Sequence, residues 1–199
     1  MLYFASFTIS RMISKNSIKL IHSLAHKKYR QKERLFLVEG DKNVLELINS
    51  GYRKVRIWAT RDFILRYETL LKNNEILSEV NHEDLARASL LKNPQNSLAL
   101  CEIPDQAEIP VILPDDLLIF LDGIQDPGNL GTILRTCDWF GIKTVFCSPD
   151  TVDLYNPKVI QASMGSFCRI QTHYIDFSGL FPILKNNQVP VYGTFMEGD

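Results

Sequence analysis

Short apolar runs alternate with stretches of helical spacing along the chain, a pattern typical of α/β proteins. In the first half, the runs predict strands at residues 36–39, 55–59 and 97–102, with shorter structure at 76–80. Helices are predicted there at residues 16–34, 41–50, 62–72 and 82–91. In the second half, strands are predicted at residues 117–121, 143–147, 169–173 and 189–192, and helices at 129–140, 157–163 and 178–186. Strands that alternate with helices of this length imply a parallel sheet in the second half.

A linker separates the two halves, because Pro104, Pro110 and Pro114 stand among acidic residues there. We therefore divide the chain into a first domain at residues 12–103, a linker at 104–116 and a second domain at 117–199. Residues 1–11 lack a basic leading segment and an obvious cleavage site. We expect them to be a disordered extension rather than a signal peptide.

The net charge of −1 hides a strong asymmetry. Residues 1–61 hold 13 Lys and Arg against 4 Asp and Glu, whereas residues 62–199 hold 9 against 19. A basic first domain is typical of RNA binding, although a solvated helix face would have the same composition. No apolar run approaches the length needed to cross a membrane, so we expect no membrane partner.

The predicted helix at residues 16–34 carries most of these cations around an apolar stripe. We predict RNA contacts from Lys15, Lys19, Lys27, Lys28, Arg30 and Arg34. His22 and His26 are four residues apart, a spacing that can bind a metal. Because lysines adjoin them and no carboxylate partner is evident, we expect a solvated or RNA-facing pair and no metal site.

The four cysteines are scattered without a C-x-x-C spacing. This usage favours reduced thiols over disulfides or zinc, so we expect a cytoplasmic protein.

The stretch at residues 121–141, LDGIQDPGNLGTILRTCDWFG, carries the most chemical information. A strand enters a tight Gly/Pro/Asn turn, and a helix then begins with Gly131 and Arg135 four residues apart on one face. A helix N-terminus suits a phosphate or a developing anion. Gly131 would let another backbone or a ribose come close to Arg135.

Simpler interpretations of this stretch stay open. A strand, a glycine-rich turn and a helix occur in many α/β proteins, and the turn is neither a phosphate loop nor a dinucleotide fingerprint. Asn129 could serve only as the helix N-cap, and Asp126-Pro127 only as turn chemistry.

The order of residues is more specific than the geometry. Asp122-Gly-Ile-Gln-Asp-Pro-Gly-Asn-Leu-Gly131, with Arg135 and Gly141 after it, resembles the first motif of the SpoU/TrmH-type RNA ribose 2′-O-methyltransferases of the SPOUT superfamily. Three further stretches resemble the same family in the same order. They are residues 36–40 (FLVEG), Pro94-Gln95, and residues 156–166 (NPKVIQASMGS). The resemblance extends from about Met12 to the C-terminus.

The resemblance implies a small α/β RNA-binding domain followed by a SPOUT parallel-sheet domain. It implies S-adenosylmethionine as cofactor, the ribose 2′-hydroxyl of rRNA or tRNA as substrate, and a homodimer. In the family, the arginine that matches Arg135 is assigned to activating the hydroxyl and the asparagine that matches Asn129 to positioning it. Because arginine stays charged, with a pKa of about 12.5 or more, we favour Arg135 as a cation that binds the flanking phosphate or the forming alkoxide. A phosphate oxygen or water would then be the base.

The sequence departs from the family after residue 194. The family's Gly-Asn-Glu loop and its later knot segment have no match here, so we expect a C-terminally truncated member that is inactive alone. Gly193 and Thr194 would be its only cofactor contacts. The alternative is a non-catalytic RNA-binding protein without the cofactor-binding knot. A small-molecule α/β enzyme would fit the fold, but no motif supports it.

Overall fold

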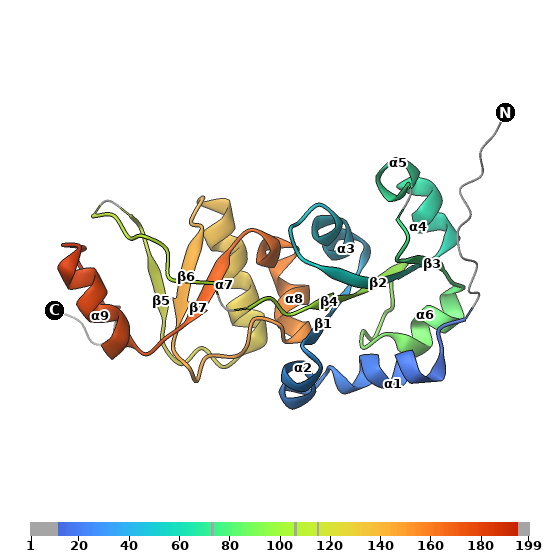
Figure 1. Cartoon of the computed structure of the whole chain (residues 1–199), viewed down its shortest axis with the longest axis horizontal. Coiled ribbons are helices and arrows are strands. Elements are labelled where there is room, and N and C mark those ends of the chain that lie inside the picture. Colours follow the sequence, from blue (N-terminus) through green and yellow to red (C-terminus); the bar gives the residue numbers. More distant parts are fainter. Residues whose placement is uncertain (1–11, 73, 106, 115, 195–199) are drawn as a thin grey trace.

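The computed structural model describes residues 12–194 except 73, 106 and 115, and its elements form two β-sheets side by side (Figure 1). The first sheet has the order β1 (Leu35–Glu39), β4 (Ser97–Glu102), β2 (Lys54–Ala59) and β3 (Leu77–Glu79). Strand β4 is antiparallel to both of its neighbours, whereas β2 and β3 are parallel.

Both faces of the first sheet are covered by helices, because its strands alternate apolar side chains between two cores. On one face, α1 (Lys15–Ser23) and α6 (His82–Ala88) pack against Leu37 and Trp58. On the other face lie α3 (Asp41–Ile48), α4 (Arg61–Arg66) and α5 (Glu68–Leu71). There Phe36, Val38 and Ile57 are fully buried.

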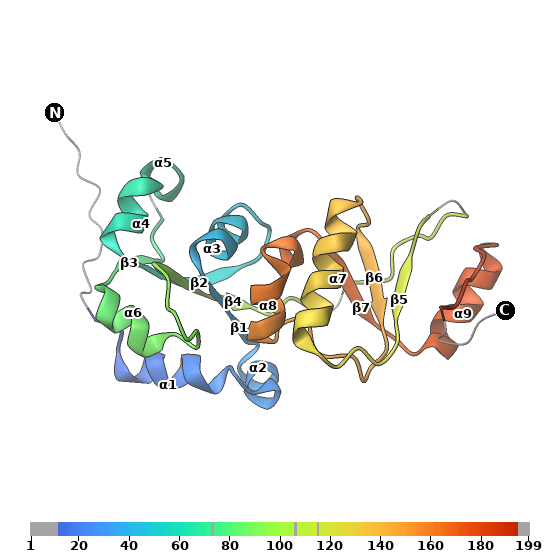
Figure 2. The same cartoon turned by 180° about the vertical axis from the view of Figure 1, so that it is seen from behind.

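The second sheet is parallel, with the order β5 (Ile119–Leu121), β6 (Thr144–Cys147) and β7 (Gln171–Tyr174). One face carries α7 (Pro127–Trp139) and α8 (Pro157–Ser163), which Figure 2 shows next to each other, and the short helix η1 (Ser166–Cys168) follows α8. Helix α9 (Phe177–Asn186) packs on the other face, over Phe146. The linker joins this second core through the buried Ile112.

The two halves are not separated by solvent, because one apolar cluster runs through both. The ring of Phe36 on β1 lies 4.7 Å from the ring of Tyr155 and 6.2 Å from that of Phe167. The expected α/β fold with a parallel second sheet is confirmed. The domain limits and the missing knot segment stay predictions.

The helix predicted at residues 16–34 is wrong as one element, since α1 ends at Ser23 and α2 (Lys27–Glu33) begins after a break of three residues. The guanidinium of Arg30 explains how the break is stabilised. It donates hydrogen bonds to the carbonyl oxygens of Leu24 (2.7 Å) and Ala25 (3.0 Å), which the interruption leaves without helical partners.

The strand predicted at residues 189–192 is also wrong. Helix α9 ends at Asn186, and Gln188 adopts a left-handed backbone with φ +58°. The N–H of Val189 then donates to the carbonyl of Leu184 at 3.0 Å. The chain therefore turns back on α9 instead of joining the sheet.

Within the described residues, no helix is long and apolar enough to span a bilayer. The predicted extension at residues 1–11 lies outside the described part.

Candidate functional site

The connection from β5 to α7 is tied to the connection after β6. The N–H of Gly123 donates to Ser148 Oγ at 2.8 Å, and the N–H of Val152 donates to the Ile124 carbonyl at 2.8 Å. Gly123 has φ +64°, a conformation that favours glycine. Both loops leave the carboxyl ends of neighbouring parallel strands, where open α/β sheets bind their ligands.

Helix α7 begins at Pro127, two residues earlier than predicted, because Asp126 is its cap. The Asp126 carboxylate accepts the N–H of Asn129 at 2.8 Å, and Pro127 occupies the first turn. The interpretation of Asn129 as the N-cap is therefore wrong. Within the described residues, the Asn129 side chain makes no hydrogen bond and is exposed, which leaves its amide free for a ligand.

Arg135 is also exposed, and it forms no ion pair with any described residue. It lies six residues after Asn129, which is about 9 Å along the helix axis. Thr132 lies between them on the exposed surface and donates to the carbonyl of Gly128 at 2.8 Å. The free amide and the free cation thus lie on one exposed side of α7.

Gly131 lies one turn before Arg135, but it is buried, and it allows α8 to pack closely. A Cβ atom at Gly131 would lie 2.5 Å from the Cβ of Ala162 and 2.8 Å from the Val159 carbonyl oxygen. The backbone that approaches Gly131 is therefore that of α8, and no ribose fits there. Ser163 and Gly165 are buried as well, and a Cβ atom at Gly165 would lie 2.5 Å from Glu46 Cγ of α3.

An ion-pair network joins α7 to the first half of the chain. The Arg169 guanidinium contacts Asp138 at 2.7 Å and Glu46 of α3 at 2.5 Å. Ser166 adds a hydrogen bond to Asp138 at 2.9 Å. The hydrogen bond from Arg169, more than any other contact, holds the pKa of Asp138 below its usual value. This network was not foreseen, since its members lie far apart in the sequence.

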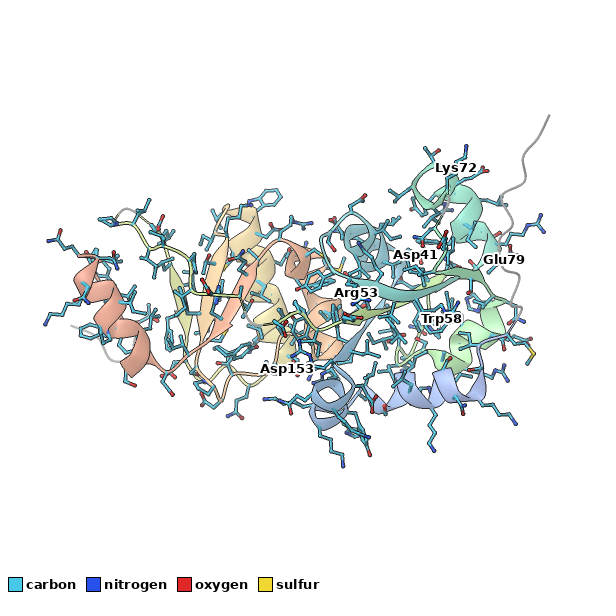
Figure 3. The ribbon with its side chains drawn as sticks, in the orientation of Figure 1. Asp41, Arg53, Trp58, Lys72, Glu79 and Asp153 are labelled. Atoms are coloured by element: carbon cyan, nitrogen blue, oxygen red, sulfur yellow. The ribbon has the colours of Figure 1, made fainter. Side chains whose placement is uncertain are left out.

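Of the predicted RNA-contacting cations, five are exposed and one is not. Those exposed on the surface are Lys15, Lys19, Lys27, Lys28 and Arg34, and Arg34 also pairs with Asp105 at 2.6 Å. Arg30 is only 2% exposed, so its prediction as a surface contact for RNA is wrong. It forms an ion pair with Asp153, which Figure 3 shows beside α2 where the two halves meet.

Glu39 is nearly buried at the end of β1. Its carboxylate accepts hydrogen bonds from Ser89 Oγ (2.5 Å) and from the N–H of Leu90 (3.1 Å). Burial raises the pKa of this carboxyl above its ordinary value, and the hydrogen bonds oppose the shift. Glu39 therefore joins β1 to the segment after α6 and has no access to a substrate.

The predicted cofactor contacts Gly193 and Thr194 are exposed and lie in irregular backbone beyond α9. Three cavities lined by described residues lie elsewhere: beside β7, at the start of α4, and between α2 and the loop after β6.

Fold and site together define an α/β protein with a basic N-terminal half and a parallel-sheet half, whose first crossover helix exposes an asparagine and an arginine. Residues 116–199 match the SpoU rRNA Methylase family, and residues 15–99 match the MRM3-like substrate binding domain. A TrmH-family chain from Porphyromonas gingivalis is similar over 94% of this chain and 73% of its own length, with 36% identity and a TM-score of 0.81. The chain belongs to the SpoU/TrmH family of RNA methyltransferases.

Two curated relatives extend the comparison. The 23S rRNA (guanosine(2553)-2′-O)-methyltransferase RlmP of Bacillus subtilis is 28% identical over 86% of this chain and 66% of its own length. The mitochondrial rRNA methyltransferase 3 of Xenopus laevis is 31% identical over 76% of this chain and 38% of its own length. The chain thus spans less than two thirds of either relative.

Proposed function

We propose that this protein takes part in the transfer of a methyl group from S-adenosylmethionine to a ribose 2′-hydroxyl of rRNA or tRNA. The observation that carries this proposal is the exposed side of α7, where the Asn129 amide and the Arg135 guanidinium both stay free of partners among the described residues. Family membership and the rRNA methyltransferase names of the relatives support it.

Methyl transfer to a hydroxyl requires that the oxygen be held in line with the methyl group and that the charge developing on oxygen be stabilised. The Asn129 amide can donate to the ribose oxygen and accept from a neighbouring hydroxyl. Arg135 supplies a cation that stays charged at every physiological pH and can bind a phosphate with two parallel N–H donors. In this proposal a phosphate oxygen or water accepts the proton.

The described residues do not by themselves fit the cofactor. Gly193 and Thr194 are exposed, and the three cavities described above are lined by other residues. S-adenosylmethionine would supply the electrophilic methyl group, and no step of the proposal depends on a contact to it in this part of the chain.

The RNA would approach along α1 and α2, where Lys15, Lys19, Lys27 and Lys28 are exposed. Helix α2 flanks a hollow that also contains Asp150 and Asn156, which lie in the loop after β6. This places the basic helices next to the carboxyl edge of the second sheet. Because the ribose is common to every nucleotide, sequence selection would come from the first half of the chain and from RNA shape.

We also propose a homodimer and a cytoplasmic location. At the end of α7, Trp139 is 86% exposed and Phe140 is 75% exposed, which is unusual for large apolar side chains that lack a partner. The four thiols are free, which supports a reducing compartment. Light scattering of the purified protein tests the dimer, and Trp139→Ser should shift it toward monomers.

The decisive experiment uses the protein expressed from its complete reading frame. It is incubated with rRNA or tRNA and S-adenosylmethionine that carries a labelled methyl group, and the product is mapped for 2′-O-methylribose. Transfer should be lost in Arg135→Gln. Arg135→Lys keeps the charge but removes the planar pair of donors, and we expect a loss of about 100-fold. If Arg135→Lys retained most of the activity, the role of the guanidinium would be wrong.

The alternative, a non-catalytic RNA-binding protein, gives a different result in the same assay. RNA would be bound, with an affinity that falls steeply with salt, but no methyl group would be transferred under any condition.

A further inference from the structure

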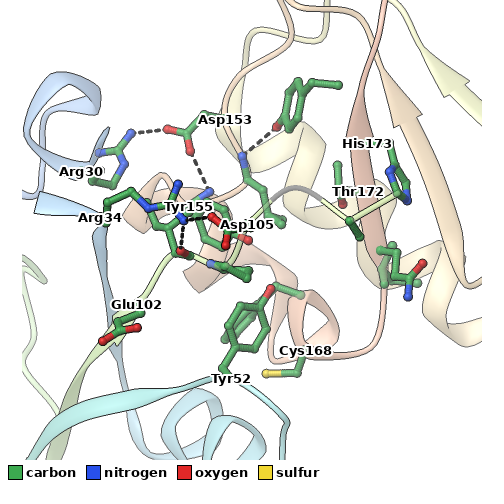
Figure 4. Close-up of a pocket in the computed structure, with 18 of the residues that line it drawn as sticks. Arg30, Arg34, Tyr52, Glu102, Asp105, Asp153, Tyr155, Cys168, Thr172 and His173 are labelled. Carbon is green, nitrogen blue, oxygen red and sulfur yellow. Dashed lines mark hydrogen bonds and ion pairs between the residues drawn. The ribbon is translucent and has the colours of Figure 1, made fainter. Parts of the chain in front are cut away.

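A cleft of about 850 Å³ lies between the two halves of the chain, beside β7, the edge strand of the second sheet (Figure 4). Its other walls come from α2, the end of β4 and the start of the linker. Among the described residues, none of those that line it belongs to α7. The cleft is therefore separate from Asn129 and Arg135. Its volume falls in the range of about 300–1,000 Å³ typical of small-molecule sites.

Strand β7 presents free main-chain groups to this cleft. The N–H of Gln171 donates to Lys143, and that of Ile175 donates to Cys147, at 2.8 Å and 2.9 Å, so the odd-numbered residues of β7 face β6. In a parallel ladder the residues between them direct both N–H and C=O to the other side. Thr172 and Tyr174 therefore point donor and acceptor pairs toward the cleft, at an edge that pairs with no other strand in the described part of the chain.

Two side chains of β7 are buried at the cleft without hydrogen-bond partners. His173 is 2% exposed, and within the described residues neither of its ring nitrogens reaches a partner at hydrogen-bond geometry, although the main chain of Ala107 lies close by. Thr172 Oγ1 is buried and unpartnered as well. Burial lowers the pKa of His173, so the neutral imidazole offers one donor and one acceptor. Buried polar groups without protein partners are costly and rare, so a ligand or an ordered water is expected to complete their hydrogen bonds.

The remaining walls of the cleft are aromatic, and its mouth is cationic. The rings of Tyr52 and Tyr155 meet edge to face at 6.4 Å, and Phe167 lies 5.9 Å from Tyr52. Five cations line the cleft, and four of them form ion pairs with carboxylates: Arg30, Arg34, Arg53 and Arg169. Lys27 has no ion-pair partner among the described residues. At the mouth, Lys27 and Arg34 are both exposed.

We propose that this interdomain cleft binds a nucleotide. The base would enter beside the aromatic wall and bond to the free main-chain edge of β7 at Thr172 and to the ring of His173, and the phosphate would lie toward Lys27. Both a free nucleotide and an unstacked nucleotide of RNA offer this chemistry, and only the second source rests on the function proposed above. An aromatic wall next to free main-chain groups favours the planar base of a nucleotide over an extended peptide that would pair with β7.

Calorimetric titration tests the site directly on the protein, with the four ribonucleoside 5′-monophosphates and the corresponding nucleosides as probes. At least one monophosphate should bind saturably, and more tightly than its nucleoside. Thr172→Val and His173→Phe should each weaken that binding by roughly tenfold, because each removes hydrogen-bonding groups from the base. Thr69→Val, on the exposed surface of α5, is the matched control and should leave binding unchanged.

Stability measurements distinguish a loss of nucleotide binding from a loss of folding. His173 packs 5.5 Å from the ring of Phe146, and His173→Phe removes buried polar atoms without emptying the position. We expect its melting temperature to equal or exceed that of the parent protein while binding is lost. Binding that is absent for all probes, or is unchanged in both variants, would overturn the proposal, as would saturable binding of an extended peptide in place of nucleotides.

Competition separates the two sources. Displacement of the bound monophosphate by a short unstructured RNA assigns the cleft to the RNA substrate, whereas no displacement assigns it to a free nucleotide. The nucleotide site and the methyltransferase function can fail separately. Nucleotide binding without methyl transfer would contradict the proposed methyltransferase function. Methyl transfer that persists without nucleotide binding in the cleft would contradict the proposed nucleotide site.

Discussion

Replacement of Gly131 by alanine tests how closely α7 and α8 pack. The new Cβ would lie 2.5 Å from Ala162 Cβ, 2.8 Å from the Val159 carbonyl oxygen and 2.9 Å from the Ser163 nitrogen. Carbon atoms normally approach to about 3.5–4.0 Å, so the overlap is about 1 Å. Two of the three contacts are with backbone atoms, which cannot rotate away as a flexible side chain would.

Two opposing effects set the size of the change. Overpacking of this kind costs about 1–3 kcal/mol, and the severe backbone overlap favours the upper half of that range. Alanine is about 1 kcal/mol better than glycine in a helix interior, which offsets part of the loss. The expected net decrease in the free energy of unfolding is about 1–2 kcal/mol, or a melting temperature lower by about 2–8 °C for a chain of this size.

Chemical and thermal unfolding of Gly131→Ala, followed by circular dichroism, measures this decrease. Gly179→Ala in α9 is the matched control, because its Cβ would meet only Ile175, at 3.4 Å, an ordinary contact. The control should be neutral or slightly stabilising. Adding Ala162→Gly to Gly131→Ala removes only the closest of the three contacts and should restore part of the stability. A Gly131→Ala protein as stable as the parent would refute the close-packing argument.

Further predictions concern a cap, a titration and a buried ion pair. Asp126→Ala should lower the free energy of unfolding by about 1 kcal/mol in denaturant titrations, since it removes a cap bond to α7, whereas Asp176→Ala, whose side chain caps nothing, should change it little. Arg169 lowers the folded-state pKa of Asp138, so the ionised Asp138 carboxylate stabilises the fold fully above the unfolded pKa near 3.8, and this stabilisation is lost as the pH falls below it. Arg169→Gln should therefore flatten the acid dependence of the free energy of unfolding in curves recorded from pH 5 to pH 2. Asp153→Asn should destabilise the protein by about 3–5 kcal/mol in denaturant titrations, because it leaves the charge of Arg30 buried and uncompensated, and a loss below 1 kcal/mol would contradict that.

The elements that the sequence predicted well are those with strong local signals. The apolar runs and the Pro and Asn punctuation located β1, β4 and α8 to within about a residue. The first family motif was recognised because its residues are contiguous, and the structure shows Asn129 and Arg135 exposed on α7. Asp126 was misassigned only because a single turn contains two good capping residues.

Elements that depend on distant partners were missed. The break between α1 and α2 is held by Arg30, and the burial of Arg30 depends on Asp153, which is 123 residues away. Composition alone made this arginine look like one more surface cation. The network of Arg169 with Asp138 and Glu46 was missed for the same reason, because its members are distant in the sequence.

By itself, the sequence determined the α/β class, the basic character of the first half and the order of residues that defines the family, because local periodicity and contiguous motifs express these properties. Only the tertiary structure decided which cations stay free, which glycine admits a neighbouring helix, and that a cleft with unpartnered polar groups opens beside β7. These properties depend on contacts between side chains that are distant in the sequence. Such contacts determine which groups are buried and which are paired, and no single segment encodes them.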